Sequence, residues 1–437
     1  MGKQLLSIPS FTAGEMSDSM QGRTDFAKYF SAASRIENFV VLPHGPITRR
    51  PGTYFVSEVK TSSAKTRLIP FSFSTEQTYV LEFGNQYIRF YKDDGQITSG
   101  GSAYEISSPY TTAQLFDLKF AQSADVMYIC NENHPVKKLS RTGHTSWTLA
   151  DVDFTDGPYL DSNTSSTTMT PSGTSGSITI TASSNVFVST DVNRFINFSG
   201  GYAKITSFGT SLAVTATVEE DFDNTNAVTD WKLGAFSTTT GFPRCVSFFE
   251  QRLVFAGTSN QPQTMFFSKS GDYENMTSGT NDDEAMIYTI ASNQVNAIQA
   301  LKATRTLIVM TTGGEYAVSS GASQDAITPT NINIRKQSNY GSSGVDALSI
   351  GNATIFLQRA KRKIRELAYN FDTDGYTAPD LTILADHISE SGLTDMSYQQ
   401  EPYSVVWAVR ADGQMAGLTY NRLENVVAWH RHILGGK

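Results

Sequence analysis

The chain has 437 residues, of which 39% are hydrophobic and only 17% charged, and its formal net charge is -8. Charge this sparse is unlike the composition of helical bundles and coiled coils, so it favours β structure. The length and composition exclude collagen, short disulfide scaffolds and fully disordered chains. A net acidic chain also has no global positive field to draw it onto nucleic acid.

The two cysteines and the N-terminal stretch indicate a protein made in a reducing compartment. Cys130 and Cys245 each lie inside an apolar run, and we expect both to be buried, reduced thiols. The N-terminal stretch lacks the apolar segment of a signal peptide. No apolar run approaches the roughly 20 residues of a membrane helix, so we expect no membrane segment.

One unit recurs along the chain: an apolar strand, a turn, a very apolar strand, a polar or Gly turn and a third strand. Its six copies begin at Arg67, Leu115, Pro243, Val295, Gly344 and Leu393. Six meanders of about 50 residues are typical of a β-propeller, in which each blade is one such sheet. The sequence therefore predicts an all-β, six-bladed β-propeller-like domain.

The step from Leu115 to Pro243 is 128 residues, which leaves a large insertion. A Ser/Thr-rich linker and alternating strands predict a small β-sandwich or barrel, a platform domain, at residues 156–241. The other predicted parts are an N-terminal arm at 1–56, first blades at 57–155 and remaining blades at 242–437. Within the arm, an apolar face behind Thr24 predicts a short helix from Thr24 to Arg35.

Motifs for chemistry are sparse. The sequence has no GxSxG, GxxxxGK[ST] or GxGxxG pattern. His430 and His432 should share one face of a strand, but a metal site would need further ligands, and half-exposed strand residues are the alternative. The acidic run Asp282–Glu284 could hold a cation or act as paired carboxylates, although a solvated loop is the simpler interpretation. We expect no catalytic residue, no metal and no cofactor.

One basic cluster lies over the turn between the second and third strands of the fifth unit. It consists of Arg359, Lys361, Arg362, Lys363 and Arg365. On a net acidic chain this cluster could meet DNA phosphates or an acidic partner. A solvated hairpin tip is the alternative.

Several segments follow one another in an order that resembles a known family. They are FTAGE (11–15), Gly22-Arg23 with Asp25 and Lys28-Tyr29, ENF (37–39), RRPGT (49–53), FEQRLVF (249–255), SKSGDYEN (268–275), 356–366, APDL (378–381) and VAWHRH (427–432). Together they cover nearly the whole chain outside the insertion. This order resembles the tail nozzle proteins of short-tailed, podovirus-like bacteriophages, also called tail tubular protein B or stabilisation protein.

The resemblance implies a structural, non-enzymatic subunit of the virion tail. Six copies would form a ring below the portal and the adaptor (head-to-tail connector) proteins, and the platform domain could contact tail fibres. The central channel would retain the packaged genome and pass it during ejection without specific binding. The residues expected to contact the adaptor or a neighbouring subunit are Arg23, Asp25, Arg49, Arg50 and Pro51.

A gate in such a channel needs turns with small residues and few buried contacts. The candidate gate segments are Gly313-Gly314, Ser319–Ser323 and Tyr340–Gly344. Two other classes stay open from the sequence alone. One is a propeller-fold tail protein that binds or hydrolyses glycans, and the other is a host-binding propeller.

Overall fold

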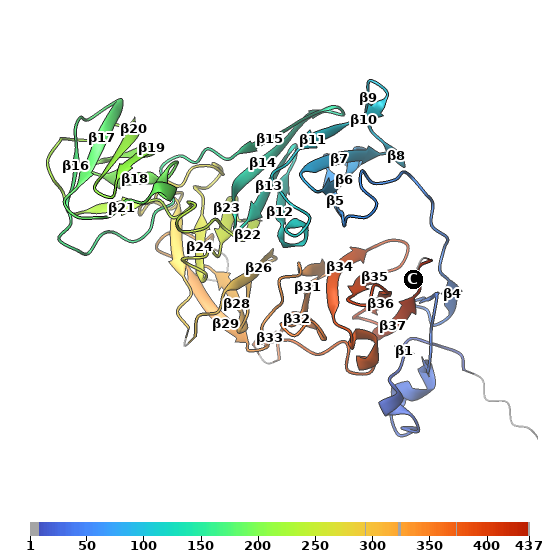
Figure 1. Cartoon of the computed structure of the whole chain (residues 1–437). Helices are drawn as coiled ribbons and strands as arrows, with labels where there is room; N and C mark the ends of the chain where they lie inside the picture. The colour runs from blue at the N-terminus through green and yellow to red at the C-terminus, as the bar shows by residue number, and fades with distance from the viewer. Residues whose placement is uncertain (1–7, 293, 322–324, 373, 436–437) are drawn as a thin grey trace, which may run out of the picture. The chain divides into compact units, whose positions relative to one another are not determined.

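The computed structural model describes the whole chain except residues 1–7, 293, 322–324, 373 and 436–437, and the described part is all-β (Figure 1). The helical segments among these residues are short 3-10 turns, with no α-helix. They are η1 (Asp18–Met20), η2 (Ala27–Ser31), η3 (Leu115–Asp117), η4 (Ser189–Asp191) and η5 (Asp386–Ser389).

Six antiparallel sheets follow the six predicted units. The first contains β5 (Arg67–Ser72), β6 (Thr78–Gly84), β7 (Tyr87–Lys92) and β11 (Glu105–Ser107), with β8 (Gly95–Gln96) beside β7 and a small hairpin of β9 (Thr98–Ser99) and β10 (Ser102–Ala103) between. The second contains β12 (Lys119–Ser123), β13 (Val126–Asn131), β14 (His134–Gly143) and β15 (Ser146–Asp151). The third contains β22 (Cys245–Phe249), β23 (Arg252–Ala256), β24 (Thr264–Phe267) and β25 (Met286–Thr289).

The remaining three sheets lie in the last third of the chain. The fourth contains β26 (Ile298–Ala303), β27 (Leu307–Thr311), β28 (Gly314–Ser319) and β29 (Asn333–Ser338), and the fifth β30 (Leu348–Ile350), β31 (Ala353–Leu357), β32 (Ile364–Asn370) and β33 (Gly375–Thr377). The sixth contains β34 (Leu393–Gln399), β35 (Val405–Arg410), β36 (Met415–Asn421) and β37 (Val426–His432). The prediction of an all-β, propeller-like chain of six meanders is confirmed.

The burial of the strands follows their side-chain pattern. β5 alternates buried and exposed residues along its length, as a strand with one face on a core should. The second strands of the third and fifth sheets, β23 and β31, are buried at every position. Continuous apolar runs of this kind are expected where both faces of a strand are covered.

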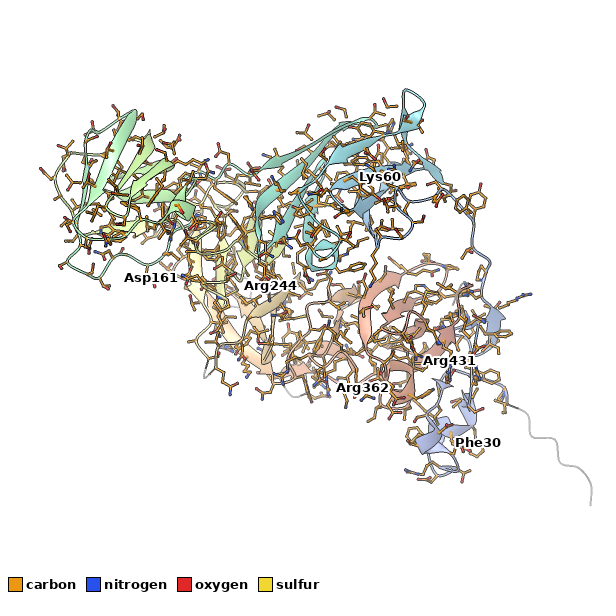
Figure 2. All side chains as sticks on the ribbon, in the orientation of Figure 1. Phe30, Lys60, Asp161, Arg244, Arg362 and Arg431 are labelled. Atoms are coloured by element: carbon orange, nitrogen blue, oxygen red, sulfur yellow. The ribbon has the colours of Figure 1, made fainter. Side chains whose placement is uncertain are left out.

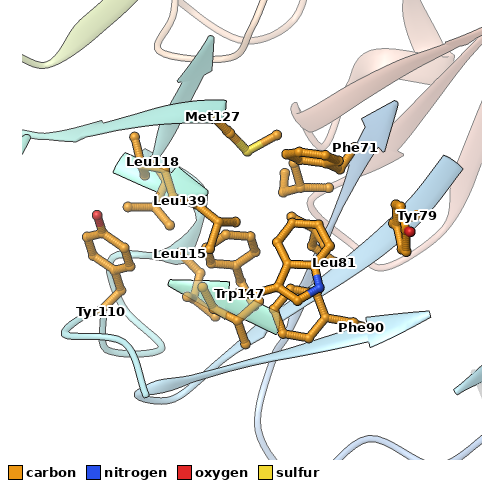
Figure 3. Packing of buried hydrophobic residues seen from close by; sticks show 14 residues of the cluster. Phe71, Tyr79, Leu81, Phe90, Tyr110, Leu115, Leu118, Met127, Leu139 and Trp147 are labelled. Atoms are coloured by element: carbon orange, nitrogen blue, oxygen red, sulfur yellow. The ribbon is translucent and has the colours of Figure 1, made fainter. Parts of the chain in front are cut away.

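The first two sheets share one apolar core, shown in Figure 3. The ring of Trp147 stacks on Phe90 with centroids 4.5 Å apart and meets Phe71 edge-on at 4.9 Å. Such aromatic pairs each add about 0.5–1.5 kcal/mol beyond the area that they bury. Trp147 lies on β15 and Phe71 on β5, so these contacts join the two sheets.

The insertion forms a sheet of its own, which Figure 1 shows in green. Its strands are β16 (Met169–Pro171), β17 (Ser177–Ala182), β18 (Phe195–Phe198), β19 (Gly201–Thr210), β20 (Ala213–Glu220) and β21 (Trp231–Leu233), paired in the order β16-β17-β20-β19-β18-β21. Val228, just before β21, exchanges two backbone hydrogen bonds of 2.8 and 3.0 Å with Met169 of β16. Because the last strand returns to the first, the sheet closes into a small barrel around its own core.

Two chain segments form a neck between this barrel and the second and third sheets. The amide of Leu160 donates to the carbonyl of Leu233 at 2.9 Å, and that of Ala235 to Pro158 at 2.7 Å. Just beyond the neck, Ala235 is fully buried and Phe236 packs on Phe266 with centroids 4.9 Å apart. Residues 235 and 236 thus pack with the strands of the third sheet, although the sequence assigned 156–241 to the insertion.

The helix expected from Thr24 to Arg35 is wrong. The structure has only the 3-10 turn η2, followed by β2 (Ala32–Ala33), and Phe30 of the expected apolar face is 52% exposed. β2 pairs in parallel with β1 (Gly14–Glu15), and the Ser31 carbonyl accepts from the Ala13 amide. Residues 31–33 are therefore backbone partners of residues 13–15 within the arm. A helix could not provide this pairing, because its own hydrogen bonds would use the same backbone groups.

By the density of its contacts the chain divides into two compact units. One comprises Met1–Phe55, Ile308–Ala317 and Arg335–Lys437, and the other Val56–Leu307 and Val318–Ile334. The arm, including the hairpin of β3 (Phe39–Val41) and β4 (Ile47–Arg49), belongs to the first unit. The barrel and the first three sheets belong to the second.

The neck predicts where the barrel can be removed. Replacing residues 161–232 with a short Gly-Ser linker should leave the other sheets folded, because the Leu160–Leu233 pair brings the cut ends together. Removing 156–241 should cost about 2–5 kcal/mol more, since it takes Ala235 and Phe236 out of a packed core. Urea unfolding of both variants would measure this difference, and complete unfolding of the shorter deletion would contradict it.

Candidate assembly site

The N-terminal arm lies along the last strand of the chain. β1 pairs in parallel with β37 through Gly14 and Trp429. Gly14 has a φ of +69°, and a Cβ there would lie 2.2 Å from the Trp429 nitrogen, so only glycine fits. The FTAGE segment of the arm therefore meets the VAWHRH segment at the far end of the sequence.

Glu15 follows Gly14 and is completely buried. Its carboxylate accepts hydrogen bonds from the Ile36 amide at 2.7 Å, from His387 Nε2 at 2.8 Å and from Arg431 Nε at 2.8 Å. Burial acts to raise the pKa of Glu15, but the hydrogen bonds from His387, Arg431 and Ile36 outweigh it and hold the pKa below its usual value. Glu15 is thus an ionised carboxylate that joins the arm to η5 and β37.

The ENF segment meets the same strand, and the RRPGT segment is bonded to the ENF segment. The Asn38 amide donates to the Arg431 carbonyl at 2.9 Å, and the Asn38 side chain accepts from the Ile433 amide at 3.0 Å. The Arg50 amide donates to the Asn38 carbonyl at 3.0 Å. From the APDL segment, the Leu381 carbonyl accepts from Trp429 Nε1 at 2.8 Å. Five separate motifs therefore meet around β37, on which Figure 2 labels Arg431.

The opposite face of β37 carries a directed chain of hydrogen bonds. Thr419 Oγ1 donates to the Val41 carbonyl of the arm at 2.7 Å, so it can accept from His430 Nε2 at 3.2 Å. His430 Nδ1 must then accept the proton of His432 Nε2, 2.6 Å away. Both rings are fully buried, so the predicted shared face is confirmed and the expected half-exposure is wrong.

Burial lowers the pKa of both histidines. The pKa of His430 falls well below its usual value, and burial together with the charge of Arg50 lowers that of His432 to about 4. Among the described residues no group of His, Cys, Asp and Glu could hold a metal ion. The two rings are therefore neutral near pH 7 and link β37 through Thr419 to Val41 of β3.

The residues expected at an assembly interface divide into two sets. Arg23 and Asp25 pair with each other at 2.8 Å, and both side chains are more than half exposed. Arg49 and Pro51 are also exposed. Arg50 is half-buried, and its guanidinium donates to the Ile433 carbonyl at 3.4 Å. Arg50 thus holds the arm against the residue that follows β37, whereas the side chains of the other four are exposed.

The structure separates the five cations of the basic cluster. Lys363 pairs with Asp380 at 3.0 Å. Arg365 is buried, donates to the Ala378 carbonyl at 2.7 Å and lies over the Tyr340 ring. Lys363 stays exposed beside its partner. Arg359, Lys361 and Arg362 are exposed and, among the described residues, form no salt bridge; Figure 2 labels Arg362.

The acidic run of the third sheet has a structural partner. Arg252 is buried, and its guanidinium donates to the backbone carbonyls of Asp282 at 2.5 Å and Glu284 at 2.7 Å. The loop is therefore held in place by an internal arginine, which the sequence did not predict. Asp282 and Asp283 are exposed, and Asp283 pairs with Lys269 at 3.1 Å. Glu284 is half-buried, and its carboxylate accepts from the Asn281 amide at 2.8 Å.

One cavity, of about 250 Å³, lies beside the neck and is lined by side chains of the second sheet and the barrel. Two carboxylates line it, but Asp151 pairs with Lys137 at 2.6 Å and Asp153 with Lys204 at 2.9 Å. Glycoside hydrolysis needs one carboxylic acid and one free carboxylate flanking the sugar. Two lysine-paired aspartates do not provide that arrangement.

The candidate gate segments are more tightly packed than expected. In Tyr340–Gly344, the Ser342 side chain is 2% exposed and donates to Glu315 at 3.0 Å. The Ser342 amide also donates to the Thr311 carbonyl, beside the Gly313-Gly314 turn. The expectation of few buried contacts is wrong for Tyr340–Gly344. Of Ser319–Ser323, residues 322 and 323 lie outside the described part of the chain.

Other expectations concern the thiols and the membrane. Cys130 and Cys245 are buried and reduced, as predicted, and burial raises the pKa of Cys130. In the described ranges, no helix is long and apolar enough to cross a membrane.

Comparison with known proteins identifies no family. No family model matches the chain, and no curated protein matches it. Solved structures similar to it include a protein of Bacteroides uniformis provisionally named a 6-phosphogluconolactonase, at 11% identity, covering 82% of this chain and 91% of that one with a TM-score of 0.35. The Swd1 β-propeller domain of Myceliophteria thermophila is 8% identical, and the match covers 82% of this chain and 100% of that one with a TM-score of 0.35. The Pan2 WD40 domain of Neurospora crassa is also 8% identical, and the match covers 72% of this chain and 78% of that one with a TM-score of 0.31. Likenesses this distant carry no argument about function.

The Glu15 contacts predict the effect of one substitution. Glu15→Gln should destabilise the arm by about 2–4 kcal/mol, because His387 and Arg431 would lose a buried, charged acceptor. Exchange of the Ile36 amide with deuterium should speed up accordingly. Glu37→Gln is the matched control, since its partner Arg35 is exposed and such surface pairs contribute about 0–1 kcal/mol. Equal exchange in both variants would contradict the assigned role of Glu15.

The histidine pair predicts acid sensitivity. Because the pKa of His432 is about 4 in the folded chain and about 6.5 when unfolded, protons bind preferentially to the unfolded chain as the pH falls between these values. The free energy of unfolding should fall by about 2 kcal/mol at about pH 5 through His432 alone. His432→Gln keeps a donor to His430 but cannot be protonated, so its urea midpoint should depend less on pH. The exposed His44→Gln control should behave like the unchanged protein.

Proposed function

We propose that this chain is a structural subunit of the tail nozzle of a short-tailed bacteriophage. The proposal rests on the ordered series of motifs from FTAGE to VAWHRH that resembles that family. Gly14, Glu15 and Asn38 contact β37, and Asn38 and Arg50 contact Ile433 just after it. These contacts support the proposal, because they connect motifs from distant parts of the sequence. Such contacts explain physically why these segments occur together.

In this role six copies form a ring below the adaptor and portal, and the genome passes through its centre. Rings of this kind use two different surface patches on each subunit. The exposed pair Arg23 and Asp25, with Arg49 and Pro51, is our candidate for one patch, facing the adaptor or the next subunit. The barrel is the candidate for contact with tail fibres.

The proposed subunit has no catalytic turnover. The paired aspartates beside the neck and the neutral, buried histidines support this part of the proposal. A glycan-cleaving tail protein is the alternative, and it would need free carboxylates elsewhere in the chain. Cleavage of cell-wall glycans by the purified protein, lost on changing one carboxylate, would favour that alternative.

Native mass spectrometry and cryo-electron microscopy test the assembly. A hexamer of this 47.8 kDa chain has a mass of about 287 kDa. We expect that mass, or six-fold density on the particle where the ring forms only there. Reversing the exposed pair, with Arg23→Asp and Asp25→Arg, keeps the net charge and should weaken assembly if this patch is used. Three-fold or five-fold density at this protein would overturn the proposal.

A further inference from the structure

Four cations and one aromatic ring surround the turn between β31 and β32, and we call this set the basic turn. Its members are Lys336, Tyr340, Arg359, Lys361 and Arg362, all within the first compact unit. Each is exposed. Among the described residues none of the four cations has a carboxylate partner, whereas the neighbouring Lys363 is paired with Asp380.

The backbone of the basic turn is held from several sides. The Lys361 carbonyl accepts from the Leu393 amide at 2.7 Å, and the Arg362 carbonyl accepts from the Ser389 hydroxyl at 2.6 Å. The Arg359 amide donates to the Gly341 carbonyl at 3.0 Å. Because these bonds fix the backbone, the cationic side chains start from a defined position, which reduces the entropy lost when a partner binds.

Lys336 joins the basic turn from a different sheet. The Arg359 guanidinium donates to the Thr312 carbonyl at 3.3 Å. Two residues further along, a Cβ added at Gly314 would lie 2.5 Å from Cε of Lys336, so this side chain crosses the same turn. Lys336 and Arg359 therefore flank residues 312–314. The sequence around 359–365 could not indicate Lys336, because this lysine lies on a different strand, far from that segment in the chain.

The aromatic ring of the basic turn has one covered face. The Arg365 guanidinium carbon lies 3.5 Å from the ring centroid of Tyr340, and 42% of Tyr340 is exposed. The carboxylate of Glu315 is buried beneath and accepts from Ser342. Burial raises the pKa of Glu315, against the opposing effect of the hydrogen bonds from Ser338 and Ser342.

We propose that the basic turn binds the phosphodiester backbone of nucleic acid. Unpaired cations beside an exposed aromatic ring suit phosphates next to sugars and bases. On a chain of net charge -8, the surplus of positive charge here is local, so it gives weak contact at one place rather than general adhesion. The inference needs no ring or virion. If the chain is also a nozzle subunit, the basic turn is where the channel contacts the genome.

Fluorescence anisotropy of the full-length protein with a labelled DNA duplex tests this proposal. With three or four phosphate contacts, log K should fall with log salt concentration at a slope of about -3 to -4. The triple variant Arg359→Gln, Lys361→Asn, Arg362→Gln should bind at least about tenfold more weakly and reduce the slope by about 2–3. Asn is chosen for Lys361 because its φ is +61°, which Asn tolerates.

The matched control removes three cations elsewhere, at Lys65, Lys232 and Arg305, each changed to Gln. Both triple variants carry the same net charge, so the control should keep the affinity and the slope of the unchanged protein. Equal weakening in both variants would overturn the proposal, because it would assign binding to overall charge. Binding of poly-glutamate but not of the duplex would also overturn it, in favour of an acidic protein partner. Thermal unfolding must show that all variants are folded.

The outcome is separable from that of the proposed function. Duplex binding that depends on the basic turn, in a protein without six-fold assembly, would sink the nozzle proposal and keep this one. A six-fold ring whose affinity for DNA is unchanged by the triple variant would overturn the proposal for the basic turn and keep the nozzle proposal.

Discussion

A buried carboxylate determines how the two ends of this chain meet. Removing the charge of Glu15 from water costs several kcal/mol, and only a complete set of donors offsets that cost. The set comes from three places: the Ile36 amide in the arm, His387 in η5 and Arg431 in β37. Because a partial set leaves an uncompensated charge, these three elements should become ordered together. The position of the arm therefore depends on the last sheet.

The strand β37 is the structural centre of this arrangement because its two faces do different work. Trp429 and Arg431 face the FTAGE segment and the Leu381 carbonyl, whereas His430 and His432 lead through Thr419 to the carbonyl of Val41. Both faces end in contacts with the arm. One face uses ionic hydrogen bonds and the other neutral ones, so acid weakens the histidine face first.

Local pattern was enough to predict the six meanders, because alternation in strands such as β5 and apolar runs such as β23 are properties of neighbouring residues. The prediction of a helix from Thr24 was wrong for a non-local reason, because residues 31–33 pair through their backbone with residues 13–15. The burial of His430 and His432 was also missed, because the residues that cover them are distant in sequence. A sequence signal for the Glu15 site did exist in the FTAGE and VAWHRH segments, but nothing in a single sequence shows that they touch.

The separation between Glu15 and Arg431 has a consequence for synthesis. The two partners are 416 residues apart, so the ribosome makes the arm long before its binding site. At about 5–20 residues per second, the arm waits roughly 20–80 s for its partner. During that time residues such as Ile36 and Val41, fully or almost fully buried in the finished protein, have no last sheet to cover them. The nascent chain is therefore most exposed to misassembly at its oldest end, and chaperones or a slow release from the ribosome would act there.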